Sequence, residues 1–156
     1  MKFPDLYNCK LAVIGLGYVG LPLAIEFAKK EKCNITNKKL NREIIGFDLN
    51  DLRIKEILSK HDRTGEINPA DLVNLTNIIF TSDKEFLKKA ELFIVTVPTP
   101  INNQKEPDLS FLEQACALIG DTLKEKKSEF NPIIIFESTV FPGATEEICA
   151  SIISKK

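Results

Sequence analysis

The stretch LAVIGLGYVGLPLA, residues 11–24, decides the fold of this 156-residue chain. It contains Gly15, Gly17 and Gly20 at the G-x-G-x-x-G spacing, which is typical of a turn that binds the pyrophosphate of a dinucleotide. In such a turn the first glycine allows the tight bend, the second lets the backbone approach the pyrophosphate, and the third packs the helix on the strand. The stretch therefore predicts a strand, a glycine-rich turn and a helix whose N-terminus faces phosphate.

The residues on either side of the glycines support this interpretation. Residues 11–14, LAVI, form a short apolar run suited to a strand that is buried on both faces. Apolar residues then recur at helical spacing, and Pro22 lies in the first helical turn, where its missing N–H costs little. An ordinary strand-turn-helix with incidental glycines is the alternative.

The rest of the chain alternates between strand and helix patterns. Apolar runs predict further strands at residues 43–48, 77–80, 91–97 and 132–136. Asn50 is expected to cap a helix that ends near Ser59. Ser110 and Glu113 are expected to form the capping box of the next helix, and a short final helix is expected over residues 145–153.

Because each strand is continuously apolar and alternates with a helix, the pattern predicts an α/β fold with a doubly wound parallel sheet, the Rossmann fold. A single dinucleotide-binding domain over residues 1–156 is expected. The sixth strand of the Rossmann order is missing at the C-terminus of the chain. This suggests that the chain is the front part of a longer protein.

Composition narrows the possible classes of function. The net charge is −1 and the lysines and acids are interspersed, so no basic stripe predicts a nucleic-acid partner. No apolar stretch reaches membrane-spanning length and the N-terminus lacks the apolar block of a signal peptide. The protein is therefore expected to be cytoplasmic, with no membrane partner.

The cysteines predict neither a metal site nor a redox site. Cys9, Cys33, Cys116 and Cys149 lie far apart and are not accompanied by clustered histidines, so a zinc site and a redox dithiol are both unsupported. Cys116 and Cys149 occur at apolar-face spacing within predicted helices, which favours packing in the core. His61, the one histidine, lies in a polar loop and is expected to be solvated.

Two charged residues follow the second predicted strand. Asp48 ends this strand, where a carboxylate can accept hydrogen bonds from both ribose hydroxyls of an adenosine, which favours NAD over NADP. Its separation from Gly20 exceeds the usual spacing because residues 31–42 resemble an inserted polar loop. The alternative is a surface aspartate that caps the next helix. Arg53 lies one turn into that helix, where it either stacks near the adenine or ribose or is simply solvated.

Two further polar segments also follow predicted strands. They are TVPTP at residues 96–100 and ESTVFPG at residues 137–143. Ligands bind at the carboxyl ends of strands in open α/β sheets, and here prolines stiffen both turns while Thr99, Ser138 and Thr139 offer hydroxyl groups. These segments are expected to border the nicotinamide half of the cofactor, with ordinary polar loops as the alternative.

Several motifs together resemble the UDP-glucose/GDP-mannose dehydrogenase family over nearly the whole chain. They are GLGYVGLPLA, the FD that ends the second strand, DRTGE at residues 62–66, VPTPI followed by PDL, and ESTVFPGATEE. Glu137 stands where UDP-glucose dehydrogenases tend to carry a lysine. For this reason the chain is most similar to the UDP-N-acetylglucosamine and UDP-N-acetylgalactosamine 6-dehydrogenases.

The resemblance implies that a sugar C6 hydroxymethyl group is oxidised to a carboxylate by two successive hydride transfers to two NAD⁺. It also implies cofactor contacts by matching motifs: Gly15, Gly17, Tyr18, Val19 and Gly20 at the pyrophosphate, Asp48 and Arg53 at the adenosine end, and Val97, Pro98, Thr99 and Thr139 on the nicotinamide side. A homodimer is implied for the full-length enzyme.

The family's catalytic cysteine, lysine, asparagine and acidic residue belong to motifs that this chain does not contain. No catalytic residue and no metal site are therefore expected here, and the chain by itself is expected to bind NAD without oxidising a nucleotide sugar. The alternatives are a UDP-glucose or GDP-mannose 6-dehydrogenase domain, a stand-alone NAD-binding module without catalysis, and a different Rossmann enzyme such as a 3-hydroxyacid dehydrogenase.

Overall fold

The computed structural model describes residues 2–73, 75–101, 106–126 and 129–155 of the chain. Within them, one parallel sheet has the strand order β3-β2-β1-β4-β5. The strands are β1 (Lys10–Ile14), β2 (Glu43–Phe47), β3 (Ile78–Thr81), β4 (Leu92–Val95) and β5 (Ile133–Phe136). This order confirms the predicted doubly wound Rossmann fold, and it places the carboxyl ends of β1 and β4 side by side where the order reverses.

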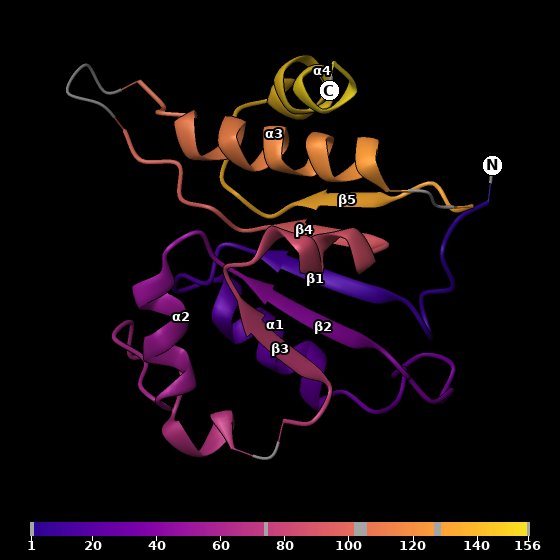
Figure 1. Ribbon diagram of the computed structural model, residues 1–156, viewed down its shortest axis with the longest axis vertical. Helices are drawn as coiled ribbons and strands as arrows, with labels where there is room; N and C mark the ends of the chain where they lie inside the picture. The colour runs from indigo at the N-terminus through magenta and orange to yellow at the C-terminus, as the bar shows by residue number, and fades with distance from the viewer. Residues whose placement is uncertain (1, 74, 102–105, 127–128, 156) are drawn as a thin grey trace.

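Helices cover both faces of this sheet (Figure 1). The α-helices are α1 (Gly20–Lys29), α2 (Asp51–Leu58), α3 (Ser110–Glu125) and α4 (Ala150–Ser154), and a π-helical turn at Thr145–Cys149 precedes α4. Short 3-10 helices occupy Pro69–Leu72 and Lys84–Lys89. Helices α1 and α2 pack on one face of the sheet, and α3 and α4 pack on the other.

The strands send alternate side chains into two separate cores. In β1, Leu11 and Val13 enter the core beneath α1 and α2, whereas Ala12 and Ile14 enter the core beneath α3. All four residues are at most 3% exposed, as expected for a parallel sheet covered on both faces. Burial on both faces is the reason that residues 11–14 are continuously apolar.

The two predicted helix caps have different outcomes. Asn50 caps α2 as predicted, because its side-chain oxygen accepts hydrogen bonds from two backbone N–H groups in the first turn. The predicted capping box of Ser110 and Glu113 is wrong, because Ser110 is the first residue of α3. Its backbone N–H donates to Asp108 Oδ1 at 2.9 Å. Asp108 therefore satisfies a free N–H group at this helix end, in place of the serine hydroxyl.

The inserted polar segment at residues 31–42 folds back on itself beside the N-terminal segment. An antiparallel bridge joins Lys32 to Lys39, and the hydroxyl groups of Tyr7 and Thr36 lie 3.2 Å apart. The segment therefore sits between α1 and β2, away from the carboxyl ends of the strands.

Strand β5 forms one edge of the sheet, and no sixth strand occurs in the described parts of the chain. Residues 102–105, which belong to the loop predicted after β4, lie outside the described residues. None of the described helices is long and apolar enough to cross a lipid bilayer.

Candidate functional site

The glycine-rich turn between β1 and α1 gives each of its glycines a different environment. Gly15 has a φ of +94°, a left-handed conformation that favours glycine. A Cβ atom on Gly20 would overlap the carbonyl oxygen of Gly15, whereas a Cβ atom on Gly17 would meet no atom within 4 Å. The turn and packing roles predicted for Gly15 and Gly20 agree with this geometry. The open space at Gly17 leaves its backbone accessible to a ligand.

Thr96, directly after β4, ties this turn to the neighbouring strand. Its hydroxyl group lies 2.7 Å from the carbonyl oxygen of Gly15 and 3.1 Å from that of Ile14, and its backbone N–H donates to Ile14 at 2.9 Å. The residue is 8% exposed. The sequence marks Thr96 only as the start of TVPTP and does not reveal this contact, because it joins residues far apart in the chain.

Asp48, at the end of β2, directs its carboxylate toward the glycine-rich turn. Its Oδ2 atom accepts a hydrogen bond from the N–H of Leu16 at 2.8 Å, and its Oδ1 atom accepts one from the N–H of Asn50 at 2.9 Å. The alternative interpretation of Asp48 as the helix cap is wrong, because the Asn50 side chain caps α2. The Asp48 carboxylate is thus held in place, and each oxygen keeps further capacity to accept a hydrogen bond.

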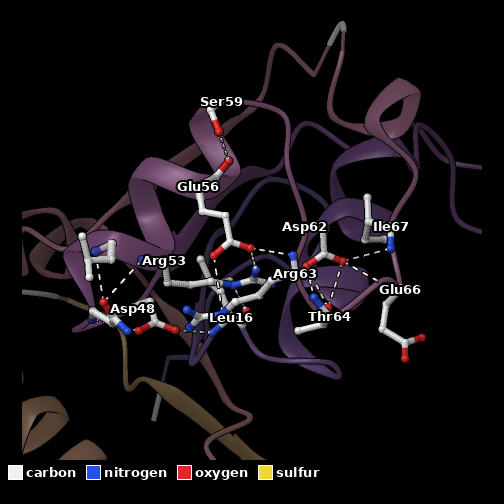
Figure 2. A network of polar contacts seen from close by, with 12 residues as sticks. Leu16, Asp48, Arg53, Glu56, Ser59, Asp62, Arg63, Thr64, Glu66 and Ile67 are labelled. Atoms are coloured by element: carbon white, nitrogen blue, oxygen red, sulfur yellow. Dashed lines mark hydrogen bonds and ion pairs between the residues drawn. The ribbon is translucent and has the colours of Figure 1, made fainter.

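Arg53 is buried at the centre of a polar network (Figure 2). It is 2% exposed, so its interpretation as a solvated helix residue is wrong. Its Nε donates to the carbonyl oxygen of Leu16 at 2.8 Å, and its two terminal nitrogens donate to Glu56 and Asp62, each at 2.7 Å. Arg53 therefore fixes the residue whose N–H orients Asp48. Its contact with the adenosine end of a cofactor stays a prediction.

The Asp62 carboxylate organises the loop that follows α2. Its side chain is fully buried and accepts hydrogen bonds from Arg53, from Thr64 and from the backbone N–H groups of Glu66 and Ile67. Burial by itself raises the pKa of Asp62, but the hydrogen bonds from Arg53, Thr64 and the backbone outweigh it and lower the pKa to about 2. The loop is therefore built around a permanent negative charge at neutral pH.

The sequence assigns residues 62–66 only to a family motif and gives no role to Glu56. The sequence does contain a signal for the ion pair between Arg53 and Glu56, because the two residues are three positions apart on one helix face. The neighbouring Ile54 and Ile57 indicate that this face is buried. The partner in the loop, Asp62, lacks such a regular spacing and could not be found this way.

Two neighbouring cavities open at the carboxyl ends of the strands. The larger has a volume of about 530 Å³ and the smaller about 180 Å³. The larger is lined by Ile14, Gly15, Gly17, Phe47, Asp48, Leu49, Asn50, Arg63, Thr96, Val97, Pro98, Phe111, Gln114, Ala115 and Leu118. The smaller is lined by Gly17, Tyr18, Val19, Thr96, Val97, Pro98, Thr99, Glu137, Ser138 and Thr139. Apart from Gly20 and Arg53, every predicted cofactor residue lines at least one of these cavities.

Two hydroxyl groups make hydrogen bonds that hold the wall of the smaller cavity together. Ser138 Oγ donates to the carbonyl oxygen of Val97 at 2.7 Å, and Thr99 Oγ1 donates to that of Thr139 at 2.8 Å. The loops after β4 and β5 are thus joined to each other across the strand ends. Thr99 and Ser138 both line the smaller cavity, and their hydroxyl groups hold its wall together; their contact with a cofactor stays a prediction.

These features fit a dinucleotide. The turn offers an open backbone approach at Gly17 in front of the N-terminus of α1, which favours a phosphate group. A fixed carboxylate lies beside it for a ribose, and the two cavities share Gly17 as a common border. The site thus has a phosphate position flanked by two compartments, as the two halves of a dinucleotide require.

The cysteines lie apart from this site. Cys9, Cys116 and Cys149 are buried, and the described residues that line the two cavities include no cysteine. Burial, together with the neighbouring Cys149, raises the pKa of Cys116 to about 12, so this thiol is protonated and a poor nucleophile at neutral pH. The predicted core packing of Cys116 and Cys149 is confirmed. His61 is exposed, as predicted.

Comparison with known proteins agrees with the motifs. Residues 9–156 match the family model described as "UDP-glucose/GDP-mannose dehydrogenase family, NAD binding domain". A Pseudomonas aeruginosa protein named UDP-N-acetyl-D-glucosamine 6-dehydrogenase is 46% identical over 148 residues, which cover 95% of this chain and 31% of that protein. The chain therefore spans about a third of the length of this relative.

Solved structures show the same arrangement. A UDP-D-ManNAc dehydrogenase from Pyrococcus horikoshii has a TM-score of 0.75 at 32% identity, with 94% of this chain and 32% of that chain covered. A UDP-glucose dehydrogenase from Pyrobaculum islandicum has a TM-score of 0.80 at 22% identity, with 99% and 34% covered; this second likeness concerns the fold alone. The chain belongs to the UDP-glucose/GDP-mannose dehydrogenase family and corresponds to its NAD-binding domain.

Proposed function

We propose that this domain serves a dehydrogenase that oxidises the C6 hydroxymethyl group of a UDP-N-acetylhexosamine to a carboxylate with two NAD⁺. The choice of NAD as the cofactor is supported by the Asp48 carboxylate, which lines the larger cavity and is held in place by two backbone N–H groups. The substrate part is supported by the 46% identity to a relative named UDP-N-acetyl-D-glucosamine 6-dehydrogenase.

We place the adenosine half of NAD in the larger cavity and the nicotinamide half in the smaller one. The pyrophosphate would lie at Gly15, Gly17 and Gly20, where the dipole and the free N–H groups at the N-terminus of α1 favour negative charge. Asp48 would accept hydrogen bonds from the ribose hydroxyls, and its charge would disfavour the 2′-phosphate of NADP. Val97, Pro98, Thr99 and Thr139 border the smaller cavity and would enclose the nicotinamide, while Tyr18 and Val19 border the same cavity on the side of the pyrophosphate. Arg53 would act indirectly, by fixing Leu16 beside the pyrophosphate.

Bound NAD⁺ supplies the hydride acceptor for the reaction. The overall change converts one hydroxymethyl group, one water and two NAD⁺ into one carboxylate, two NADH and three protons. We assign no side chain of this domain to the covalent chemistry, because its buried thiols lie away from both cavities. The domain's contribution is to bind and orient the cofactor, while the groups that act on the sugar would come from the rest of the full-length protein.

Two measurements test this function. Calorimetric titration of the 156-residue chain should show binding of NAD⁺ that is tighter than binding of NADP⁺. The full-length protein should produce two NADH for each UDP-N-acetylglucosamine consumed, whereas the 156-residue chain should produce none. NADH formation by the chain alone would contradict the division of roles. Oxidation of UDP-glucose in preference to the N-acetylated sugar by the full-length protein would contradict the proposed substrate.

A stand-alone NAD-binding module is the second candidate. It would bind NAD⁺ with the same preference, but the native protein in its host would have the mass of this chain, 17.5 kDa. An immunoblot of the host extract distinguishes the two, since the dehydrogenase requires a product about three times as large, as the coverage of the relative indicates. Cytoplasmic location and homodimer formation stay predictions for the whole protein.

A further inference from the structure

We propose that Arg63 is a further contact for the adenosine half of NAD, with its guanidinium group covering one face of the adenine base. Arg63 lies in the loop after α2 and lines the larger cavity together with Asp48 and Asn50. It does not line the smaller cavity. The proposal rests on the placement of the adenosine half in the larger cavity, and it does not depend on which sugar the full-length protein oxidises.

The lining of the larger cavity suits a planar base with one cation over it. Its charged lining residues, within the described parts of the chain, are Asp48 and Arg63. The lining also includes Leu49 and Phe111, whose side chains are exposed. Exposed apolar side chains that line a cavity gain contact area when a flat aromatic ligand covers them. An arginine in the same position stacks on such a ligand through its planar guanidinium group.

The backbone of Arg63 is already fixed in place, as Figure 2 shows. Its N–H group donates to Glu56 Oε1 at 2.6 Å. The preceding residue, Asp62, accepts the bond from Arg53 and the backbone hydrogen bonds that close the loop. Binding a ligand would therefore require ordering of the Arg63 side chain only, and not of the loop that carries it.

The side chain of Arg63, in contrast, is weakly held. It is 55% exposed, and its Nε lies 3.4 Å from Glu56 Oε2, while the other Glu56 oxygen already accepts hydrogen bonds from Arg53 and from the backbone of Arg63. The Glu56 carboxylate is only 13% exposed, but this one long contact leaves most of the Arg63 side chain in solvent, so the ion pair contributes little. The two terminal nitrogens of Arg63 make no hydrogen bond to any described residue, so the guanidinium group can turn over a base without losing a strong contact.

Arg53 cannot take this role with its own guanidinium group. All three of its nitrogens donate to protein atoms, and the side chain is buried beneath Leu16. The two arginines thus have different roles. Arg53 holds the loop and the glycine-rich turn together, and Arg63 is presented by that loop to the cavity.

Calorimetric titration of the protein with NAD⁺, ADP-ribose and nicotinamide mononucleotide tests the proposal. Arg63→Ala should lower the affinity for NAD⁺ and for ADP-ribose about five- to tenfold, as expected for loss of stacking on a base. The affinity for nicotinamide mononucleotide should stay unchanged. Arg63→Lys should restore only a small part of this loss, because an ammonium group cannot stack. Lys55→Ala removes the same charge from the exposed surface of α2 and should leave all three affinities unchanged.

The salt dependence separates stacking from a contact with phosphate. The loss caused by Arg63→Ala should be similar at about 0.05 M and about 0.5 M salt, because stacking is little screened. A loss that disappears at the higher salt and is fully restored by Arg63→Lys would overturn the proposal in favour of a phosphate contact. Unchanged NAD⁺ affinity in a folded Arg63→Ala variant, confirmed by circular dichroism, would overturn it as well. Absence of NADH formation by the full-length protein would count against the proposed function alone.

Discussion

Replacement of Gly20 by alanine should destabilise the protein far more than the same replacement at Gly17. A Cβ atom on Gly20 would lie far closer than 3.0 Å to the carbonyl oxygen of Gly15 and to Thr96 Oγ1. The carbonyl oxygen belongs to the backbone and already accepts a hydrogen bond from the Thr96 hydroxyl group, so neither atom is free to move away. At Gly17 the added methyl group would meet no atom within 4 Å.

The size of the effect follows from three contributions. Forcing α1 away from the turn is overpacking, which typically costs about 1–3 kcal/mol and more when the opposing atom is backbone. Disturbing the buried Thr96 hydrogen bond adds about 1 kcal/mol, and alanine recovers up to about 1 kcal/mol of helix propensity. The free energy of unfolding should therefore fall by about 1–4 kcal/mol, which lowers Tm by roughly 2–16 °C in a chain of this size.

Thermal and urea unfolding followed by circular dichroism measure this difference. Gly17→Ala is the matched control and should unfold within about 0.5 kcal/mol of the unmodified protein. The same variant should lose NAD⁺ affinity by about tenfold or more, because the added carbon occupies the approach of the pyrophosphate to the backbone. Equal Tm values for the two variants would refute the claim that Gly20 is required by the packing of the helix on the turn.

Three further predictions concern single side chains. The pKa of Asp62 is lowered to about 2 from 3.8, so its contribution to stability should be complete above about pH 4 and should be lost as the pH falls toward about 2. Urea midpoints should therefore fall more steeply with acid in the unmodified protein than in Asp62→Asn, and parallel curves would contradict this. In calorimetric titrations, Asp48→Asn should lower the affinity for NAD⁺ and reduce the ratio of the NAD⁺ affinity to the NADP⁺ affinity. An unchanged ratio would exclude the contact between Asp48 and the ribose. Hydrogen bonds from Thr36 and the backbone of Ile35 lower the pKa of Cys33 to about 7. Iodoacetamide should therefore modify Cys33 before the buried cysteines at neutral pH. Peptide mass spectrometry that finds Cys116 modified first would contradict this prediction.

The fold was predictable because its signals are local or periodic. The apolar run at residues 11–14 and the glycine spacing after it fixed the first strand and helix, and the alternation of later runs predicted the parallel sheet. Asn50 was found as a cap because its side chain acts on its own helix. Ser110 was misassigned because serine and aspartate both suit such positions, and only the backbone path shows that Asp108 lies nearer to the free N–H group.

The site was less predictable because several of its contacts join distant parts of the chain. The positions of Gly15, Gly17 and Asp48 follow from their motif, but the burial of Arg53 depends on Leu16 and Asp62, which belong to different segments. The contact between Thr96 and the glycine-rich turn crosses from β4 to β1 in the same way. Such pairings need the packed sheet, and no spacing within one segment encodes them.

The bond from Thr96 to Gly15 also constrains the order of events during synthesis. All three glycines of the turn leave the ribosome early, yet Thr96, which braces their turn, lies about 80 positions later, directly after the strand β4 that pairs with β1. A nascent chain that ends before β4 therefore carries the complete glycine motif without the braced turn. The hydrogen bond that Thr96 makes to the turn therefore forms only after β4 has paired with β1, whereas the contacts of the turn with β2 need only the first half of the chain.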